Sequence, residues 1–256
     1  MAKYTGYFID LDGTIYQGTT QFPAGKRFIE RLQASGTDYL FVTNNSTKTP
    51  AMVAQNLTEN HGIITTPAQV YTSAMATADY LATLPAIKRV LVIGEDGLRS
   101  AVAQKGFEIV TTAPADAVVM GIDRQFTYDQ LVQATFAIQA GAKFIATNVD
   151  TNLPTELGLQ PGAGSLVAAL QTATQTEPIV IGKPFTVIMD GALALTGHTK
   201  DEVIMVGDNY NTDILAGINA GIDTLLTYTG VSKPADVHAK MAQPSYEVTN
   251  LDEWEI

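Results

Sequence analysis

The sequence predicts an α/β protein with a Rossmann-like, doubly wound parallel sheet and a second, smaller α/β domain inserted into it. Short apolar runs alternate with helical stretches almost throughout the chain, as in parallel sheets covered by helices. Four polar motifs cluster towards the two ends of the chain, whereas the middle has its own strand–helix pattern and none of these motifs. We therefore expect a catalytic core of residues 1–80 and 181–256, with an α/β cap domain at residues 81–180.

The expected elements follow this alternation in order. Strands are expected where short apolar runs end in Gly or polar residues, at Tyr4–Leu11, Asp38–Thr43, Val90–Gly94, Ala117–Ile122, Lys143–Thr147, Pro178–Gly182, Glu202–Gly207 and Thr224–Tyr228. Helices are expected between them, at Ala24–Ser35, Pro50–His61, Ala74–Leu84, Tyr128–Ala140, Gly164–Thr176, Thr186–Thr196 and Thr212–Ala220. These strands are too many for one ordinary sheet, which favours the inserted domain.

Composition narrows the possible functions. With 256 residues, 46% of them hydrophobic, the chain can form a sizeable core. The net charge of −11 disfavours a nucleic-acid partner, because binding to a phosphate backbone requires clustered Lys and Arg. Cysteine is absent, which excludes disulfides, zinc–thiolate sites and thiol nucleophiles and fits a reducing cytosol.

No run approaches the roughly 20 apolar residues of a membrane span, and no apolar signal segment opens the sequence. We expect a cytoplasmic protein.

The first motif is a pair of acids after an apolar run. Asp10 and Asp12 follow Tyr7-Phe8-Ile9, and Gly13 lets the backbone turn directly afterwards. Residues two apart in a strand point to the same face, so the two carboxylates are expected to lie together where the strand ends. In open α/β sheets ligands bind at this edge. The alternative is an ordinary Asp-Gly turn.

The second motif follows the strand expected at Asp38–Thr43. Thr43 offers a hydroxyl donor, and the backbone N–H groups of Asn44, Asn45 and Ser46 can form a concavity that binds an anion. An Asn/Ser-rich turn, or an N-cap for the next helix, explains the same residues when they are considered alone.

The third motif is Gly182-Lys183-Pro184, directly after the apolar run Ile179-Val180-Ile181. A lysine in this place can reach over the strand end and neutralise a phosphate or a carboxylate. A nucleotide-binding P-loop is excluded, because no Ser or Thr follows Lys183 and Glu177 stands where that motif requires its first Gly. The remaining alternative is a solvated surface lysine.

The fourth motif joins a strand end to a helix. Asp208 comes after Val203–Gly207, and Asp213 stands five residues later at the start of the next helix. Asp208 is placed to ligate a hard cation, which prefers oxygen ligands. Asp213 suits the first turn of a helix, where the dipole favours an acid, and we expect it also to orient the site. All four motifs fall at carboxyl ends of strands, so they are expected to meet at one edge of a parallel sheet.

These motifs resemble the haloacid dehalogenase superfamily of aspartate-nucleophile phosphohydrolases. The resemblance rests on Asp-x-Asp-Gly-Thr at residues 10–14, on Thr43, on Lys183 and on Gly-Asp-x-x-x-Thr-Asp at residues 207–213, in the family's order. Further similarity, at residues 44–46, 146–150, 182–184 and 212–217, is to the NagD-like branch with its para-nitrophenyl phosphatases and its inserted α/β cap. The resemblance covers essentially the whole chain.

The resemblance implies a Mg²⁺-dependent hydrolysis of small phosphorylated metabolites through an aspartyl-phosphate. It implies that Asp10 attacks phosphorus and that Asp12 moves the protons. It places Mg²⁺ on Asp10, the backbone carbonyl of Asp12, and Asp208, and it assigns charge stabilisation to Thr43 and Lys183.

Other residues receive lesser roles from the same resemblance. It implies that Asn44 helps to bind phosphate and that Asp213 and Asn209 support the site. The cap is expected to close over the site and to provide specificity. Its candidate residues, which follow two expected strands, are Asp123, Asn148 and Asp150. Ordinary strand-exit turns are the alternative for all three.

We expect a small phosphorylated metabolite as partner, without nucleic acid or membrane, and a monomer or a cap-mediated homodimer. Gly162-Ala163-Gly164 lacks the third Gly of a dinucleotide motif, since Val167 stands there.

The competing hypothesis is a non-catalytic phosphometabolite-binding or regulatory protein on the same fold. A receiver-type signalling domain is disfavoured by the inserted domain and by the second acid, Asp12.

Overall fold

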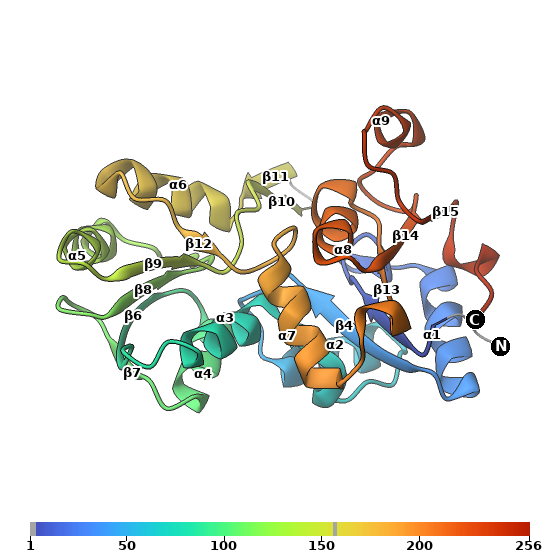
Figure 1. Ribbon diagram of the computed structural model, residues 1–256, viewed down its shortest axis with the longest axis horizontal. Helices are drawn as coiled ribbons and strands as arrows, with labels where there is room; N and C mark the ends of the chain where they lie inside the picture. The colour runs from blue at the N-terminus through green and yellow to red at the C-terminus, as the bar shows by residue number, and fades with distance from the viewer. Residues whose placement is uncertain (1–3, 156–157) are drawn as a thin grey trace. The chain divides into compact units, whose positions relative to one another are not determined.

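A computed structural model describes residues 4–155 and 158–256 (Figure 1). The chain forms two compact units. The first consists of the residues up to Thr43, Pro50–Tyr71 and Lys183–Ile256, and the second of Asn44–Thr49 and Thr72–Gly182. The chain therefore passes between the two units at 43/44, 49/50, 71/72 and 182/183. The domain boundaries expected from the sequence, at 80/81 and 180/181, stay predictions. The roles of the two units as catalytic core and cap remain predictions.

A six-stranded parallel sheet forms the centre of the first unit. Its strands lie in the order β15-β14-β13-β1-β4-β5. Their bounds are β1 (Gly6–Ile9), β4 (Asp38–Thr43), β5 (Val70–Thr72), β13 (Val203–Gly207), β14 (Asp223–Thr227) and β15 (Tyr246–Val248). Strand β1 is central: Gly6 pairs with Val203 on one side and with Asp38 on the other. Every residue of β1 is buried, because sheet neighbours and helices enclose it on all sides.

Helices cover both faces of this sheet. They are α1 (Pro23–Ser35), α2 (Pro50–His61), α7 (Thr186–Thr196), α8 (Leu215–Ala220) and α9 (Pro234–His238), with short turns η1 (Pro67–Gln69), η2 (Lys200–Glu202), η3 (Tyr210–Ile214) and η4 (Leu251–Glu253). Phe28 of α1, Leu57 of α2 and Leu251 of η4 share one hydrophobic cluster with Ile9 and Phe41 of the sheet. Helices α7 and α8 pack together against β4 and β14. The result is the layered arrangement of a doubly wound sheet.

The second unit has its own five-stranded parallel sheet in the order β12-β9-β8-β6-β7. Its elements are α3 (Ser73–Ala82), β6 (Arg89–Ile93), α4 (Asp96–Gln104), β7 (Glu108–Val110), β8 (Ala117–Met120), α5 (Tyr128–Gln139), β9 (Lys143–Ala146), α6 (Ala163–Thr174) and β12 (Ile179–Val180). Helix α3 packs against α4, and α5 against α6. An antiparallel hairpin, β10 (Asn152–Thr155) with β11 (Gly158–Pro161), precedes α6.

The predicted fold class is confirmed, and the differences concern short elements. Several short elements were not predicted, namely the hairpin of β2 (Tyr16–Gln17) with β3 (Thr20–Gln21), the strands β5, β7 and β15, the helix α9 and the β10–β11 pair. Elements of two to five residues are too short to show a period. Helix α4 was also missed. Its first turn contains Gly97, where a Cβ atom would lie 2.6 Å from the Lys48 carbonyl oxygen, so close backbone packing explains this helix-disfavouring residue.

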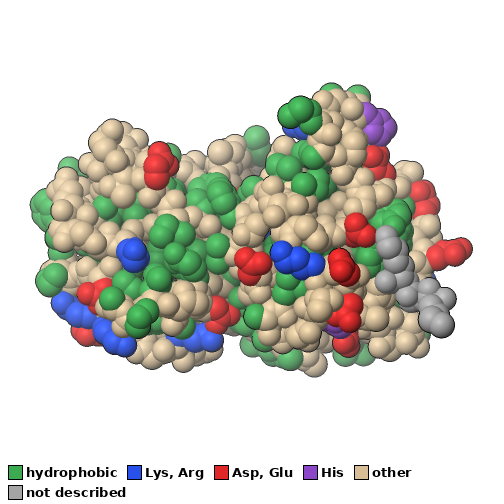
Figure 2. All heavy atoms as spheres, in the orientation of Figure 1, with side chains coloured by type: hydrophobic (Ala, Val, Ile, Leu, Met, Phe, Trp, Pro, Cys, Tyr) green, Lys and Arg blue, Asp and Glu red, His purple; other side chains and the backbone are tan. Residues whose placement is uncertain are grey.

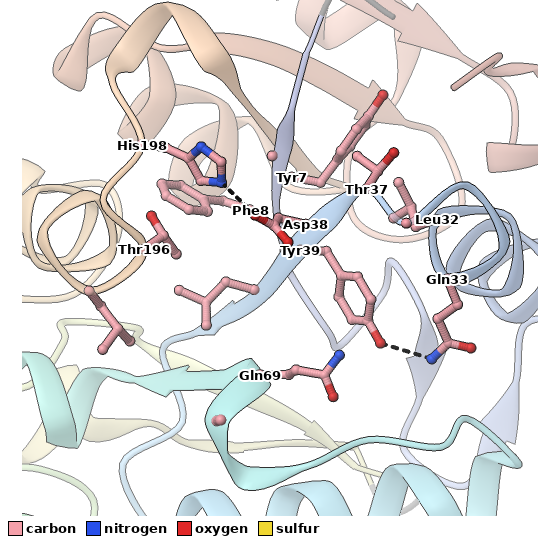
Figure 3. A pocket seen from close by; sticks show the side chains of 15 residues that line it. Tyr7, Phe8, Leu32, Gln33, Thr37, Asp38, Tyr39, Gln69, Thr196 and His198 are labelled. Carbon is pink, nitrogen blue, oxygen red and sulfur yellow. Dashed lines mark hydrogen bonds and ion pairs between the residues drawn. The ribbon is translucent and has the colours of Figure 1, made fainter.

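A cavity of about 610 Å³ opens at the amino ends of β1 and β4 in the first unit. Gly6 and Asp38, the first residues of these strands, line it together with Tyr39, Gln33 and His198. Figure 3 shows the imidazole of His198 directed at Asp38, 3.3 Å away, and the Gln33 amide directed at the Tyr39 hydroxyl. None of the predicted site residues lines this cavity, because they follow the opposite, carboxyl ends of the strands.

On the face drawn in Figure 2, the described Lys and Arg side chains are scattered among acidic ones. Among residues 4–155 and 158–256, no helix has the length and apolar character needed to cross a bilayer.

Candidate active site

The carboxyl edge of the core sheet brings several predicted site residues together. Asp10 directly follows β1, Thr43 ends β4, and Asp208 directly follows β13, which is the neighbour of β1. Asp10, Thr43 and Asp208 are all buried. Parallel strands share one carboxyl edge, so the predicted convergence of these three residues follows from the topology.

Lys183 is buried between two carboxylates. Its Nζ lies 2.6 Å from Oδ1 of Asp10 and 2.8 Å from Oδ1 of Asp213, and it donates to the backbone carbonyl of Val42 at 2.8 Å. The lysine side chain is 1% exposed, which rules out the alternative of a solvated surface lysine. Three acceptors surround the ammonium group, which has three protons to donate.

These contacts change the protonation of both partners. Burial alone would lower the pKa of Lys183, but the carboxylates of Asp10 and Asp213 outweigh it and raise that pKa. Burial and the carboxylate of Asp213 raise the pKa of Asp10 well above its usual range, although Lys183 opposes them. The cluster therefore keeps its cation charged and disfavours negative charge on Asp10.

Asp208 is held by neutral donors. Its Oδ1 accepts from the Thr14 hydroxyl at 3.1 Å and its Oδ2 from the Val231 N–H at 2.7 Å. Glycines enclose it closely: a Cβ at Gly13 would lie 2.5 Å from Oδ2, and a Cβ at Gly230 would also collide with this carboxylate. Burial and the nearby Asp213 raise the pKa of Asp208 to about 7.

Asp213 lies inside the cluster and not at an exposed helix end. Its Oδ2 accepts from the Asn209 N–H at 3.0 Å, and its side chain is buried. Tyr210–Ile214 forms a π-helical turn before α8, and the Asn209 side chain caps that turn by accepting from Asn211 N–H at 3.0 Å. The helix predicted at Thr212–Ala220 is therefore two pieces, with Asp213 in the first of them.

The arrangement fits a hard divalent cation. Oxygen atoms of Asp10, Asp208 and Asp213 all lie within 4.8 Å of one another. If all three carboxyl groups ionise, as binding of a cation requires, they carry a charge of −3 against the single +1 of Lys183, so a net −2 is left for a bound cation to compensate. An all-oxygen, strongly anionic donor set suits Mg²⁺-type ions, and the glycines at 13 and 230 leave its carboxylates room that a side chain would take. The acidic cluster thus indicates a divalent metal site.

Asp12 differs from the other acids because it is exposed. Its Oδ1 accepts from the Gly18 N–H at 3.4 Å, and its backbone bridges to Tyr16. The Asp12 side chain is not part of the buried carboxylate cluster. An exposed carboxylate beside a buried one is available for proton exchange with water or substrate.

The second unit contains another polar cluster around Asn44, the residue after Thr43. The side-chain amide of Asn44 donates to the two carboxylate oxygens of Asp150 at 3.1 and 3.3 Å. The backbone carbonyl of Asn44 accepts from the Asn148 side-chain amide at 2.9 Å and from the Ser73 hydroxyl at 2.7 Å. A Cβ at Gly182 would lie 2.6 Å from the Asn44 side-chain oxygen. Two of the three predicted specificity residues, Asn148 and Asp150, thus hold the loop that follows β4.

Asp123 lies elsewhere in the second unit. Its carboxylate accepts from the Gln125 N–H at 2.9 Å and from the Gln130 amide at 3.4 Å, within its own loop and the following helix α5. This is the pattern of a turn residue, the alternative considered from the sequence.

Sequence reasoning missed several residues that hold the cluster. The Thr14 hydroxyl lies within hydrogen-bond distance of Asp208 and, at 3.5 Å, of Asp10. The loop after β14 supplies two further donors: the Val231 N–H donates to Asp208, and the Thr229 hydroxyl donates to the Gly13 carbonyl at 2.8 Å. The signal for this loop was Thr229-Gly230-Val231 directly after an expected strand, since that strand end meets the same sheet edge.

Comparisons with known proteins agree with this geometry. The sequence profile described as haloacid dehalogenase-like hydrolase matches residues 7–108, and a second profile, described as HAD-hydrolase-like, matches residues 180–254. The 5′-nucleotidase YutF of Bacillus subtilis is 46% identical over 254 residues, which are 99% of this chain and 98% of that protein. An acid sugar phosphatase of Staphylococcus aureus is 45% identical over 253 residues, 99% of this chain and 97% of that protein.

Solved structures give the same result. A thermostable NPPase mutant from Geobacillus stearothermophilus superimposes with a TM-score of 0.94 at 47% identity, over 100% of this chain and 99% of that one. The 4-nitrophenylphosphatase of Thermotoga maritima has a TM-score of 0.91 at 32% identity, over 98% and 96% of the two chains.

With this sheet, this carboxylate cluster and these relatives, the chain belongs to the haloacid dehalogenase superfamily. Within it, the near full-length similarity is to the NagD-like phosphatase branch. The protein is a phosphoric monoester hydrolase that acts on small phosphomonoesters.

Proposed function

We propose that this phosphatase uses Asp10 as its nucleophile, Asp12 as its proton shuttle and Mg²⁺ as its metal ion. The observation that carries the proposal is the place of Asp10, held against Lys183 and beside Asp208 and Asp213 at the carboxyl edge of the sheet. An acid with a cation on one side and metal-ligand carboxylates on the other is suited to attack an anionic phosphate.

In the first displacement, a carboxylate oxygen of Asp10 forms a bond to phosphorus as the bond from phosphorus to the leaving oxygen breaks. The electron pair of that bond stays on the leaving oxygen, which takes the proton of the Asp12 carboxyl group and departs as an alcohol. Asp12 is left as a carboxylate and Asp10 as an aspartyl-phosphate.

In the second displacement, water attacks the same phosphorus. The Asp12 carboxylate accepts a proton from this water, the bond between Asp10 and phosphorus breaks, and inorganic phosphate is released. Asp12 is then protonated and Asp10 ionised, ready for another cycle. The exposure of Asp12 supports this role, because its proton must pass to and from mobile groups.

Charge on the phosphoryl oxygens requires donors. Thr43 supplies a hydroxyl at the end of β4, Lys183 supplies its ammonium group, and Asn44 follows Thr43 directly in the chain. Donors fixed before the reaction stabilise developing charge without having to reorganise. The three contacts that fix Lys183 support this assignment.

The metal would be held by Asp10, the backbone carbonyl of Asp12, and Asp208, with Asp213 and Asn209 in support. When bound, a divalent cation screens the repulsion between an anionic nucleophile and an anionic phosphate. The chain's own part is to keep these oxygens together: Thr14 and Val231 orient Asp208, and the Asn209 N–H orients Asp213.

The proposed substrates are small phosphorylated metabolites, namely nucleotides, sugar phosphates or similar phosphomonoesters. The names of the relatives support these classes. We propose Asn148 and Asp150, with Asp123 as a lesser candidate, as residues of the cap that influence specificity. A cytoplasmic location and a monomeric or cap-dimeric state stay predictions, the second testable by light scattering after gel filtration.

The test is phosphate release from para-nitrophenyl phosphate and from a panel of nucleotides and sugar phosphates, with Mg²⁺ present. Wild type is expected to turn over at least one of these substrates, and Asp10→Asn none of them. Equal activity of the two proteins across the panel would contradict the proposed mechanism.

A further inference from the structure

We infer that Tyr16 and His61 are positioning residues for Asp12, acting through the small hairpin β2–β3. The inference rests on the proposed function, in which Asp12 moves the protons. It concerns residues outside the four motifs, and it explains how an exposed acid is kept in a defined place.

The backbone of Tyr16 fixes the loop that carries Asp12. The Gly13 N–H donates to the Tyr16 carbonyl at 2.6 Å, the Tyr16 N–H donates to the Leu11 carbonyl at 3.3 Å, and Asp12 and Tyr16 form an isolated backbone bridge. The turn of the hairpin then returns to the acid, because the Gly18 N–H donates to the Asp12 carboxylate at 3.4 Å. Displacing Tyr16 therefore displaces both the backbone and the carboxylate contact of Asp12.

The hairpin cannot order itself. Its strands are two residues long, and even longer isolated two-stranded hairpins are only marginally stable in water. Its side chains are half-buried or exposed, so burial within the hairpin contributes little. The ordering must come from neighbouring parts of the first unit.

The carboxyl end of α2 provides that support at two points. The Tyr16 and His61 rings are stacked, with centroids 4.2 Å apart and planes 13° from parallel. One residue earlier, the Asn60 carbonyl accepts from the Gln21 amide at 2.6 Å. His61 is 3% exposed and lies at the last position of α2, so its buried ring gives the half-buried ring of Tyr16 a fixed surface to pack on.

The chemistry provides a specific readout. An alkoxide leaving group needs the proton of Asp12, whereas para-nitrophenolate is a stable anion that departs with little help. Misplacing Asp12 therefore slows alkyl phosphates more than para-nitrophenyl phosphate. A general loss of folding slows both classes equally.

The experiment measures kcat/KM, which reports the first displacement and not the shared hydrolysis of the aspartyl-phosphate, for an alkyl phosphate and for para-nitrophenyl phosphate in four variants. We expect His61→Ala and Tyr16→Leu to lower kcat/KM for the alkyl phosphate about tenfold more than for the aryl one, a part of the roughly 10²–10⁴ that a general acid contributes. The readout is the ratio of kcat/KM for the alkyl phosphate to kcat/KM for para-nitrophenyl phosphate. Because Tyr16→Phe and His61→Phe keep two stacked aromatic rings, their ratios are expected to stay within about twofold of the wild-type ratio.

The control is Val53→Ala, which removes methyl groups from another side chain of α2 that is also 3% exposed and belongs to the hydrophobic core. It is expected to lower thermal stability and leave the ratio unchanged. In metal-free protein, we expect faster amide exchange at Gly18 in His61→Ala and Tyr16→Leu, but not in Val53→Ala.

The variant Asp12→Asn distinguishes a failure of the positioning role of Tyr16 and His61 from a failure of the proton shuttle. A large alkyl-selective loss in Asp12→Asn with unchanged ratios and Gly18 exchange in His61→Ala and Tyr16→Leu would overturn the positioning role alone. No alkyl-selective loss in Asp12→Asn itself would overturn the proton shuttle and, with it, the proposed function of Asp12.

Discussion

The Nζ atom of Lys183 lies 2.6 Å from the carboxylate of Asp10 and 2.8 Å from that of Asp213. One buried cation thus joins the acid after the first strand to the acid that precedes α8. Because all three side chains are almost fully buried, each depends on the others for compensation of its charge. The proposed nucleophile, Asp10, is therefore held in place by a residue whose positive charge would also attract an anionic phosphate.

Replacing this lysine tests that dependence. Lys183→Met leaves two buried carboxylates without their cation, so we expect a loss of about 3–5 kcal/mol in the free energy of unfolding of the metal-free protein. We also expect kcat/KM for para-nitrophenyl phosphate to fall by about 10²–10³. Denaturant unfolding in EDTA and steady-state kinetics in Mg²⁺ measure the two effects.

The matched control is Lys26→Met, which removes an exposed ion pair with Glu30 at 3.8 Å. Surface pairs contribute about 0–1 kcal/mol, so stability and activity are expected to stay close to wild type. If Lys183→Met lost no more stability than Lys26→Met, the buried ion pairs of Lys183 would not be needed for the folded state.

Asp208 gives a prediction for pH. Its pKa is about 7 in the folded protein and 3.8 in the unfolded one, so between these values the folded state holds more protons. Stability of the metal-free protein therefore falls as pH rises through this window, by about 4 kcal/mol at most for this group. Asp208→Asn removes the titration and is expected to be more stable than wild type at pH 8 but not at pH 4, as thermal unfolding in EDTA would measure.

Metal binding has the opposite dependence, because the cation needs the ionised carboxylate. The increase in melting temperature produced by Mg²⁺ is expected to grow as pH rises towards 7 in wild type and to be lost in Asp208→Asn. If the increase in melting temperature produced by Mg²⁺ did not depend on pH, or if it persisted in Asp208→Asn, Asp208 would be excluded as a ligand.

Gly13 is predicted to be irreplaceable for two separate reasons. Its φ angle is +93°, a region that side chains disfavour, and a Cβ there would meet the Asp208 carboxylate at 2.5 Å. Gly36, with φ +69° and open space around its Cβ position, isolates the first reason. Both Gly→Ala variants are expected to lose about 1 kcal/mol or more of stability. In a calorimetric titration, only Gly13→Ala is expected to lose Mg²⁺ affinity as well.

The second unit offers a pair of acids for comparison. Asp150 accepts from the Asn44 amide, whereas Asp123 accepts from Gln125 and Gln130 in its own loop. Because Asp150→Ala releases the side chain of Asn44, we expect KM for the preferred substrate to rise about tenfold, as for loss of one charge-assisted hydrogen bond. Asp123→Ala is expected to leave KM within twofold. Equal effects of the two changes would remove Asp150 as a specificity candidate.

The sequence was sufficient to predict the fold class and the sheet edge because these follow from periodicity and topology. Asp10, Thr43 and Asp208 each stand directly after or at the end of an apolar strand, and parallel strands bring such positions together. The close contact between Lys183 and Asp213 was not predicted, because helix α8 is preceded by a π-helical turn that carries Asp213 inward. Spacing along the sequence contains no signal for that turn.

The individual contacts that support the site were also not predicted, although the position of residues 229–231 after an expected strand indicated the sheet edge where they lie. Thr14 and Val231 contact Asp208 from segments more than 200 residues apart in the chain, and the Tyr16–His61 stack joins a two-residue strand to the end of a helix. Such contacts depend on tertiary packing, and neither hydrophobic period nor local turn chemistry indicates them.

Transfer of the phosphoryl group to Asp10 can be detected directly. Rapid acid quenching during turnover of para-nitrophenyl phosphate, followed by borohydride reduction and peptide mapping, locates an aspartyl-phosphate as homoserine. We predict homoserine at position 10 in wild type and in larger amount in Asp12→Asn, where attack by water is slowed. Homoserine at position 12, 208 or 213 would contradict the mechanism. So would the absence of homoserine from position 10 in both wild type and Asp12→Asn.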